Sequence, residues 1–214
     1  MKLLTKKQSK NLDKNSVNKF NVAESALMDS AAKCIFDYIE NHNNALKKKL
    51  RVLILCGKGN NGGDSICLAN MLKRKDYNVH VHFLLEKNQI RNLSLKYHDE
   101  YIELSSSISY GLEIKEYDDF DFIVDGIIGI GFRGTLSQDL IDWVSWINKS
   151  DLFVLSVDIP SGLNADNGLA SPTAVKANVT ITFGYAKIGL YLADGKDHVG
   201  EIIIEDIGLP KKAL

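Results

Sequence analysis

The sequence predicts an α/β fold, a three-layer αβα sandwich around a mainly parallel, doubly wound sheet. Segments with helical character alternate with short apolar runs, and two of these runs, 52–55 and 122–128, contain almost no polar residues. Strands of this kind are covered on both faces, which is typical of parallel sheets joined by helical crossovers. A chain of 214 residues with 45% hydrophobic content can bury one sizeable core, so we expect a single domain.

The first 50 residues are predicted to form helices. Asn21 and Glu24 have the spacing of a capping box for a helix that runs to about Glu40, and the polar segment before them also has helical character. We expect these N-terminal helices, residues 1–50, to precede a Rossmann-like core at residues 51–210.

The core elements are predicted from apolar runs of strand length and from the helical periodicity between them. In order, they are a strand at 52–55, a helix from about 63 to 74, a strand at 79–85, a helix from about 89 to 104, a short strand at 112–117, a strand at 122–128, a helix capped by Ser137 that runs to about 148, and strands at 152–157, 179–183 and 201–204.

Charge and cysteine content restrict the class of protein. The formal net charge of −1 argues against a nucleic-acid-binding surface held by counterion release. The three cysteines, Cys34, Cys56 and Cys67, are odd in number and lie in apolar segments, as reduced, buried thiols do. The N-terminus lacks an apolar stretch of signal-peptide length, and no apolar run approaches membrane-spanning length. We therefore expect a soluble cytoplasmic protein with no nucleic-acid or membrane partner.

The segment VLILCGKGNNGGD, residues 52–64, is the most informative part of the chain. An apolar strand stops at glycines and amides and then meets a carboxylate. Glycines without Cβ atoms let a ligand approach the backbone N–H groups, and the helix predicted to start near Gly63 adds its positive end. The glycines are Gly57, Gly59, Gly62 and Gly63. We expect an anionic, nucleotide-like ligand here.

The glycine spacing alone does not identify the ligand. Gly57-x-Gly59-x-x-Gly62 satisfies the dinucleotide-binding fingerprint, which is weak in isolation. A kinase-type phosphate loop is disfavoured because Gly63 and Asp64, rather than Lys and Ser or Thr, follow its last glycine. Two asparagines and an aspartate exceed what a phosphate cradle needs, so they suggest an ion or a reacting group.

Three predicted strand ends are expected to meet at one site. They are the segment 59–64, Asp125 with the loop GIGFRGT at 129–135, and the segment DIPSG at 158–162. The carboxyl ends of parallel strands share one edge of the sheet, so Asp64, Asp125 and Asp158 can converge despite their separation in sequence.

Longer motifs resemble a known family. GKGNNGGD (57–64), VDGIIGIG (124–131), SVDIPSGLNADNG (156–168), FGYAKIGLYL (183–192) and GKDHVGEIIIEDIGLP (195–210) are similar to the YjeF N-terminal domain family, the NAD(P)H-hydrate epimerases. The resemblance runs from about residue 20 to 210. It implies interconversion of the R and S forms of hydrated NADH and NADPH, called NADHX and NADPHX, for coenzyme repair together with an ADP- or ATP-dependent dehydratase, fused or separate. It also implies a homodimer.

The resemblance assigns site residues to this sequence. Those implied to bind the hydrated nucleotide are Asn60, Asn61, Gly62, Gly63, Asp64, Gly129, Ile130, Gly131, Phe132, Arg133, Gly134, Thr135 and Asp158. One potassium ion per subunit is implied at Asn61, Asp125 and Ser161, whose amide, carboxylate and hydroxyl oxygens suit a hard cation.

The implied reaction requires the C6 hydroxyl of the nicotinamide ring to leave and to return on the other face. A carboxyl group with a raised pKa can protonate the departing hydroxyl and deprotonate the incoming water. Asp158 is the predicted catalytic group and Asp64 the second candidate. Each assignment has a structural alternative: Asp158 could cap a turn, and Asp125 could bond backbone groups.

Other polar and aromatic residues are expected to lie outside the catalytic set. Lys187 and Tyr185 are predicted to be structural or at the rim of the site, and Trp143 and Trp146 to lie in the core or at a subunit contact. The alternative functions are a non-enzymatic nucleotide- or protein-binding module of the same fold and an ordinary Rossmann oxidoreductase. The chain has all the carboxylates that the resemblance implies for the site, which favours an enzyme over a binding module. An ordinary oxidoreductase would leave the VDIPSG segment unexplained.

Overall fold

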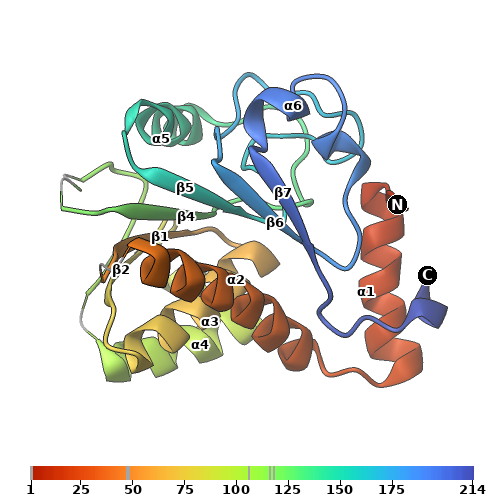
Figure 1. Cartoon of the computed structure of the whole chain (residues 1–214), viewed down its shortest axis with the longest axis horizontal. Helices are drawn as coiled ribbons and strands as arrows, with labels where there is room; N and C mark the ends of the chain where they lie inside the picture. The colour runs from red at the N-terminus through yellow and green to blue at the C-terminus, as the bar shows by residue number, and fades with distance from the viewer. Residues whose placement is uncertain (1, 47–48, 106, 116, 118) are drawn as a thin grey trace.

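The protein is a three-layer αβα sandwich around a seven-stranded sheet (Figure 1). The structure is a computed structural model that describes residues 2–46, 49–105, 107–115, 117 and 119–214. All six strand pairings are parallel, and the strand order is β3-β2-β1-β4-β5-β6-β7. This confirms the predicted fold class.

The strands are short and mostly buried. They are β1 (Arg51–Cys56), β2 (Asn78–Phe83), β3 (Ile108–Tyr110), β4 (Phe122–Gly126), β5 (Phe153–Val157), β6 (Val179–Phe183) and β7 (Glu201–Glu205). The chain leaves β1 toward β2 on one side and later returns to β4 on the other, so the strand order reverses between β1 and β4. Ligand sites of open α/β sheets form at the carboxyl ends of strands at such a reversal.

Helices cover both faces of the sheet. They are α1 (Lys6–Phe20), α2 (Glu24–Leu46), α3 (Asn60–Arg74), α4 (Asn92–Leu104), α5 (Gln138–Lys149) and α6 (Gly195–His198), with short 3-10 turns η1 (Lys87–Gln89), η2 (Ile188–Leu190) and η3 (Lys211–Ala213). Helices α2, α3 and α4 lie below the sheet in Figure 1, and α5 and α6 lie above it. Each face has its own apolar cluster, one around Ile35 and Ile66 and the other around Trp143.

Helix α1 belongs to neither layer. It stands beyond the carboxyl ends of the strands, at the right of Figure 1. A capping box between Thr5 and Gln8 starts it. The residue before the cap, Leu4, forms a parallel bridge with Lys187, in which Leu4 N donates to Ala186 O (2.9 Å) and Ile188 N donates to Leu4 O (3.0 Å). The start of the chain is therefore joined to a segment more than 180 residues later.

Two predictions about helix starts are wrong. Asn21 is not the N-cap of α2 but the C-cap of α1, where it adopts a left-handed conformation (φ 54°) that asparagine tolerates well; α2 begins at Glu24. Helix α3 begins at Asn60 rather than near Gly63, so the NNGGD segment forms its first turn and is not a loop.

The short strand predicted at 112–117 is also wrong. The strand lies earlier, at Ile108–Tyr110, and the described residues 112–115 and 117 form no strand; residue 116 lies outside the described residues. Gly111 ends β3 because its positive φ of 105° turns the chain away, and its N–H donates to Phe83 O (3.0 Å) and Leu85 O (3.2 Å). Helix α4 starts three residues after its predicted beginning, because residues 87–89 form a 3-10 turn.

Other expectations about the core are confirmed. The cysteines are free thiols, and Trp143 is fully buried. Cys56 and Cys67 are buried as expected, whereas Cys34 is only half-buried. Within the described part of the chain, the search for a helix long and apolar enough to cross a membrane finds no candidate.

Candidate active site

Glycines bring helix α3 close to the ends of β1 and β4. A Cβ atom on Gly57 would lie 1.7 Å from Ile127 O, and one on Gly62 would lie 2.0 Å from Gly57 O. Both positions exclude a side chain because the neighbouring atoms are backbone. A Cβ on Gly59, in contrast, would meet nothing within 4 Å. The sequence interpretation that the glycines open the backbone to a ligand therefore fits Gly59, whereas Gly57 and Gly62 serve packing.

Two cavities adjoin at this edge of the sheet. The first, which we call the acidic cavity, has a volume of about 320 Å³ and is bounded by α1, the first turns of α2 and α3, and the ends of β5 and β6. Its charged lining residues are Asp13, Lys14, Glu24, Asp64, Asp158 and Lys187. The second has a volume of about 530 Å³. Its lining includes residues 57–61 and 127–131, and we call it the glycine-loop cavity. Both volumes are in the range of small-molecule sites.

The cavities share one wall. Asp13, Asn60, Asn61 and Ile130 line both of them. The glycine-loop cavity is also lined by Gly129 and Gly131, as the resemblance implied for the nucleotide. The described residues Phe132, Arg133, Gly134 and Thr135 line neither cavity; Arg133, Gly134 and Thr135 are exposed and Phe132 is buried. Gly62 and Gly63 are buried inside α3 and line neither cavity.

Asp158 lies where β5 ends, in a strained turn. Its φ of 65° is left-handed, and its N–H donates to Ile181 O (2.7 Å). The carboxylate Oδ1 accepts hydrogen bonds from Thr182 Oγ1 (3.0 Å) and Phe183 N (3.2 Å) and forms an ion pair with Lys187 Nζ. A non-glycine residue in this conformation persists only where its surroundings hold it, and such residues cluster at functional sites.

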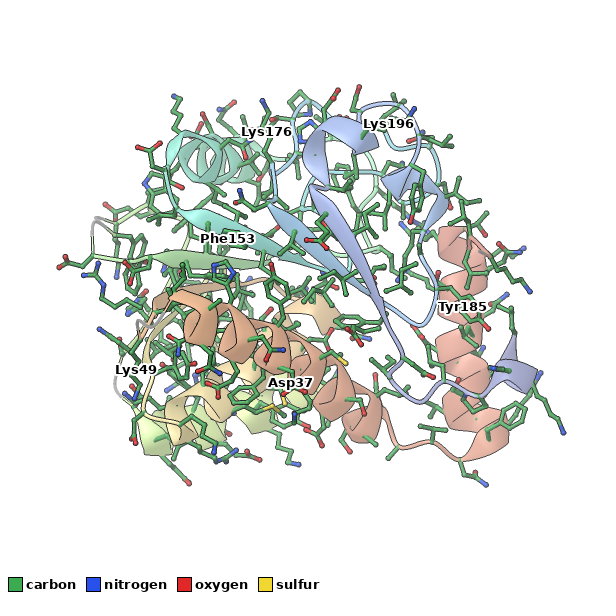
Figure 2. All side chains as sticks on the ribbon, viewed as in Figure 1. Asp37, Lys49, Phe153, Lys176, Tyr185 and Lys196 are labelled. Atoms are coloured by element: carbon green, nitrogen blue, oxygen red, sulfur yellow. The ribbon has the colours of Figure 1, made fainter. Side chains whose placement is uncertain are left out.

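Lys187 is the first site residue that the sequence interpretation missed. Its side chain is buried (3% exposed), and Nζ donates to Thr182 Oγ1 (2.9 Å) and Phe183 O (3.3 Å) as well as to Asp158. The prediction of a structural or rim role did not include this ion pair in the lining of the acidic cavity. Tyr185, two residues earlier, packs with Leu4 and Leu12 beside α1 (Figure 2), which agrees with a structural role.

Asp64 lies in α3 and faces the same cavity. Burial raises the pKa of its carboxyl well above the usual range, the carboxylates of Asp158 and Asp13 raise it further, and Lys187 opposes them. This environment favours the protonated carboxyl, the form that can donate a proton. Asp158, in contrast, accepts from Lys187 Nζ in an ion pair.

Asp13 of α1 is the second site residue that the sequence interpretation missed. It is half-buried, and desolvation raises its pKa to about 6, with the Asp158 carboxylate adding to the rise and Lys187 lowering it. Nothing in the sequence around Asp13 distinguishes it from a surface residue of a polar helix. The signal that could have found it is three-dimensional: α1 crosses the carboxyl ends of the strands.

Asp125 and Ser161 meet beneath the cavities. Asp125 is fully buried, and its carboxylate accepts hydrogen bonds from Ser156 Oγ (2.8 Å), Ser161 N (2.9 Å) and Ser161 Oγ (2.5 Å). Burial raises the pKa of Asp125, and the serine donors oppose that rise. No described Lys, Arg or His side chain forms an ion pair with it. Asn61, the third implied potassium ligand, donates from Nδ2 to Val157 O (2.5 Å) at the end of the next strand.

An α/β fold with cavities at the reversal of its strand order defines a doubly wound open-sheet protein, a class whose ligand sites form at that edge. The chain matches the family described as YjeF-related protein N-terminus over residues 24–189, and it belongs to that family.

Curated relatives agree with this assignment, and a solved structure shares the fold. The chain is 36% identical over 211 residues to the NAD(P)H-hydrate epimerase of Oenococcus oeni, covering 96% of each protein. It is 31% identical to the bifunctional NAD(P)H-hydrate repair enzyme Nnr of Dictyoglomus turgidum, of which it spans 41%. The crystal structure of a yeast protein, YNL200c, has the same fold, with a TM-score of 0.81, 19% identity, and coverage of 96% of this chain and 88% of the yeast chain.

Proposed function

We propose that the protein is an NAD(P)H-hydrate epimerase, an isomerase that interconverts the R and S forms of NADHX and NADPHX. The names of its relatives support this activity. The structural observation that best supports it is the acidic cavity. There, Asp64, whose pKa burial raises, lines the same cavity as the ion-paired carboxylate of Asp158.

The acidic cavity suits the charge changes of this reaction. Loss of the C6 hydroxyl, assisted by the lone pair of the ring nitrogen, leaves an iminium-like cation. Carboxylates fixed around the ring stabilise such a cation, because their orientation costs no reorganisation during the reaction. We assign Asp64 and Asp158 to the ring face that they contact: Asp64 is the acid that protonates a hydroxyl departing from that face, and Asp158 is the base that accepts a proton from water entering there. Lys187 positions Asp158 through their ion pair.

The two cavities together accommodate a dinucleotide. We assign the hydrated ring to the acidic cavity and the remainder of the nucleotide to the glycine-loop cavity, along the first turn of α3 and the loop at 129–135. The positive end of α3 and the open space over Gly59 favour an anionic group there. Arg133, which is exposed, is available to a phosphate from the rim of that loop.

A potassium ion fits the residues around Asp125. The donors are a carboxylate, a serine hydroxyl and an asparagine amide, all hard oxygen ligands. A fully buried carboxylate without a cationic partner among the described residues also favours a bound cation. We propose that Asn61, Asp125 and Ser161 hold one potassium ion per subunit. When bound, the ion offsets the charge of Asp125 and fixes the ends of β4 and β5.

The physiological setting is proposed on the same basis. We propose that the chain is one domain that acts with an ADP- or ATP-dependent NAD(P)HX dehydratase, as a separate or fused protein. The relative from Dictyoglomus turgidum is named bifunctional, and this chain corresponds to 41% of it. A cytoplasmic homodimer remains our expectation from the free cysteines and the family resemblance.

The test is the conversion of purified R-NADHX to the S form, followed by chromatographic separation of the epimers, with potassium present. We expect the protein to accelerate the conversion over buffer and Asp158→Asn to abolish the acceleration. Asp197→Asn, the same change at an exposed residue of α6, serves as the matched control. A folded protein that binds the nucleotide without accelerating conversion would refute the proposal and favour the binding-module alternative.

A further inference from the structure

The acidic cavity has two walls from different parts of the chain. Asp64, Asp158 and Lys187 project from α3 and the strand ends, and we call this wall the sheet side. The opposite wall is α1, which stands across the carboxyl ends of the strands (Figure 1) and contributes Ser9 and Asp13 to the lining. A ring bound between these walls presents one face to each of them.

Helix α1 is held rigidly in this position. At its start, Lys6 Nζ donates to Gly131 O (3.0 Å) and Phe132 O (2.6 Å) in the loop at 129–135. Lys6 N donates to Asp166 Oδ1 (2.6 Å). Further along the helix, Asn15 Nδ2 donates to Ala213 O (2.8 Å). The bridge between Leu4 and Lys187 joins the same helix to the residue that pairs with Asp158. Asp13 is therefore fixed relative to the sheet-side carboxyls, as a catalytic group must be.

A second side chain on α1 points to a ligand on this wall. Ser9 lies one helical turn before Asp13 and is 5% exposed, and its hydroxyl has no hydrogen-bond partner among the described residues. Buried polar groups are normally paired, so an unpaired hydroxyl that lines a cavity indicates a partner supplied by the ligand.

The epimerisation itself needs a proton carrier on each face of the ring. The hydroxyl departs from one face with a proton, and water enters at the other face and gives up a proton. The sheet-side carboxyls can serve only the face that they contact. We propose that Asp13 is a further catalytic residue, the acid and base for the ring face that lies toward α1; this inference rests on the epimerase function proposed above.

The proton and electron balance is simple. When the hydroxyl faces α1, the Asp13 carboxylic acid protonates it, the C6–O bond breaks with its electron pair on the departing water, and the ring nitrogen lone pair forms the C=N bond. Water then adds to C6 from the sheet side and releases its proton to a carboxylate there. For the opposite epimer the two walls exchange roles, so no other reactant is consumed.

The charges around Asp13 fit both roles. The charged groups that share its cavities are Lys10 and Lys14 of α1, Glu24 of α2, Asp64 of α3, Asp158, Lys187 and Lys58. Desolvation and the Asp158 carboxylate bring its pKa to about 6, near neutral pH, where one carboxyl can both give and take a proton.

Exchange of the hydroxyl with labelled water tests this assignment. Each pure epimer of NADHX is incubated in H₂¹⁸O with the wild-type protein, Asp13→Asn, Asp13→Glu or Asp197→Asn, and mass spectrometry of the separated epimers follows the label. We expect Asp13→Asn to reduce epimerisation by about 100-fold or more. One starting epimer should still gain ¹⁸O with retention of configuration, and the other should become inert. Asp13→Glu should restore part of the epimerisation.

The outcomes separate this proposal from its alternatives. Epimerisation within threefold of wild type in Asp13→Asn would overturn it. So would an equal loss of epimerisation and of label exchange from both epimers in a folded variant, because a structural role predicts that pattern. A wild-type protein that neither epimerises nor exchanges label would instead refute the proposed function.

Discussion

Replacing Lys187 by methionine removes the positive charge from the acidic cavity and retains an unbranched side chain of similar length. Asp158, 7% exposed, would then keep only the hydroxyl of Thr182 and the N–H of Phe183 as donors. Removal of one partner of a buried ion pair costs about 3–5 kcal/mol, because the other charge stays buried without compensation. Because these two donors remain, we expect the free energy of unfolding to fall by an amount near the lower end of this range, about 3 kcal/mol. For a chain of this size, that corresponds to a fall in Tm of about 6–12 °C.

Urea denaturation at pH 7, followed by tryptophan fluorescence, measures this loss. Lys196→Met, at an exposed lysine of α6 (Figure 2), should change the free energy of unfolding by no more than about 0.5 kcal/mol. The double variant Lys187→Met/Asp158→Asn should recover at least half of the loss, since neither charge is then buried alone. A Lys187→Met protein within about 1 kcal/mol of wild type, or a double variant no more stable than the single one, would show that the ion pair does not form.

Three further changes have expected outcomes. Gly62→Ala places a Cβ atom 2.0 Å from Gly57 O and should lower Tm by several degrees, whereas Gly59→Ala, with open space above it, should leave Tm nearly unchanged in the same thermal scan. The pKa of Asp13 is raised to about 6 from 3.8, so its ionisation destabilises the folded state as pH rises from about 4 to 6. Asp13→Asn should therefore be more stable than wild type at pH 7.5, and the difference in Tm should vanish below pH 4. Potassium should raise the Tm of wild type more than lithium does and have no such effect on Asp125→Asn; equal responses to both ions would argue against the proposed ion site.

Strand positions could be read from the sequence because burial on both faces leaves a strong signal. The short apolar run Val52–Leu55, followed at once by glycines, favours an interior strand of a parallel sheet, and β1 lies there. The start of α3 was misplaced because glycines normally break helices, whereas here Gly62 and Gly63 permit close packing inside the first turn. A local rule was overridden by a tertiary contact, which a single sequence does not display.

The same contrast between local sequence signals and tertiary contacts applies to the candidate site. Asp64 and Asp158 follow strands within recognisable motifs, so the topology of the sheet alone predicts that they approach each other. Asp13 and Lys187 enter the site from the two ends of the chain, and both look like ordinary polar residues in sequence. Only the bridge between Leu4 and Lys187, together with the path of α1, brings them to the acidic cavity.

That bridge also determines when the site can form during synthesis. Residue 4 leaves the ribosome long before its partner at residue 187 is made. The bridge between Leu4 and Lys187 therefore cannot form until almost the whole sheet has been translated. Contacts between such distant residues form slowly because closing a long loop costs chain entropy before any contact offsets it. The acidic cavity is thus assembled late, only after the segment around Lys187 has been translated.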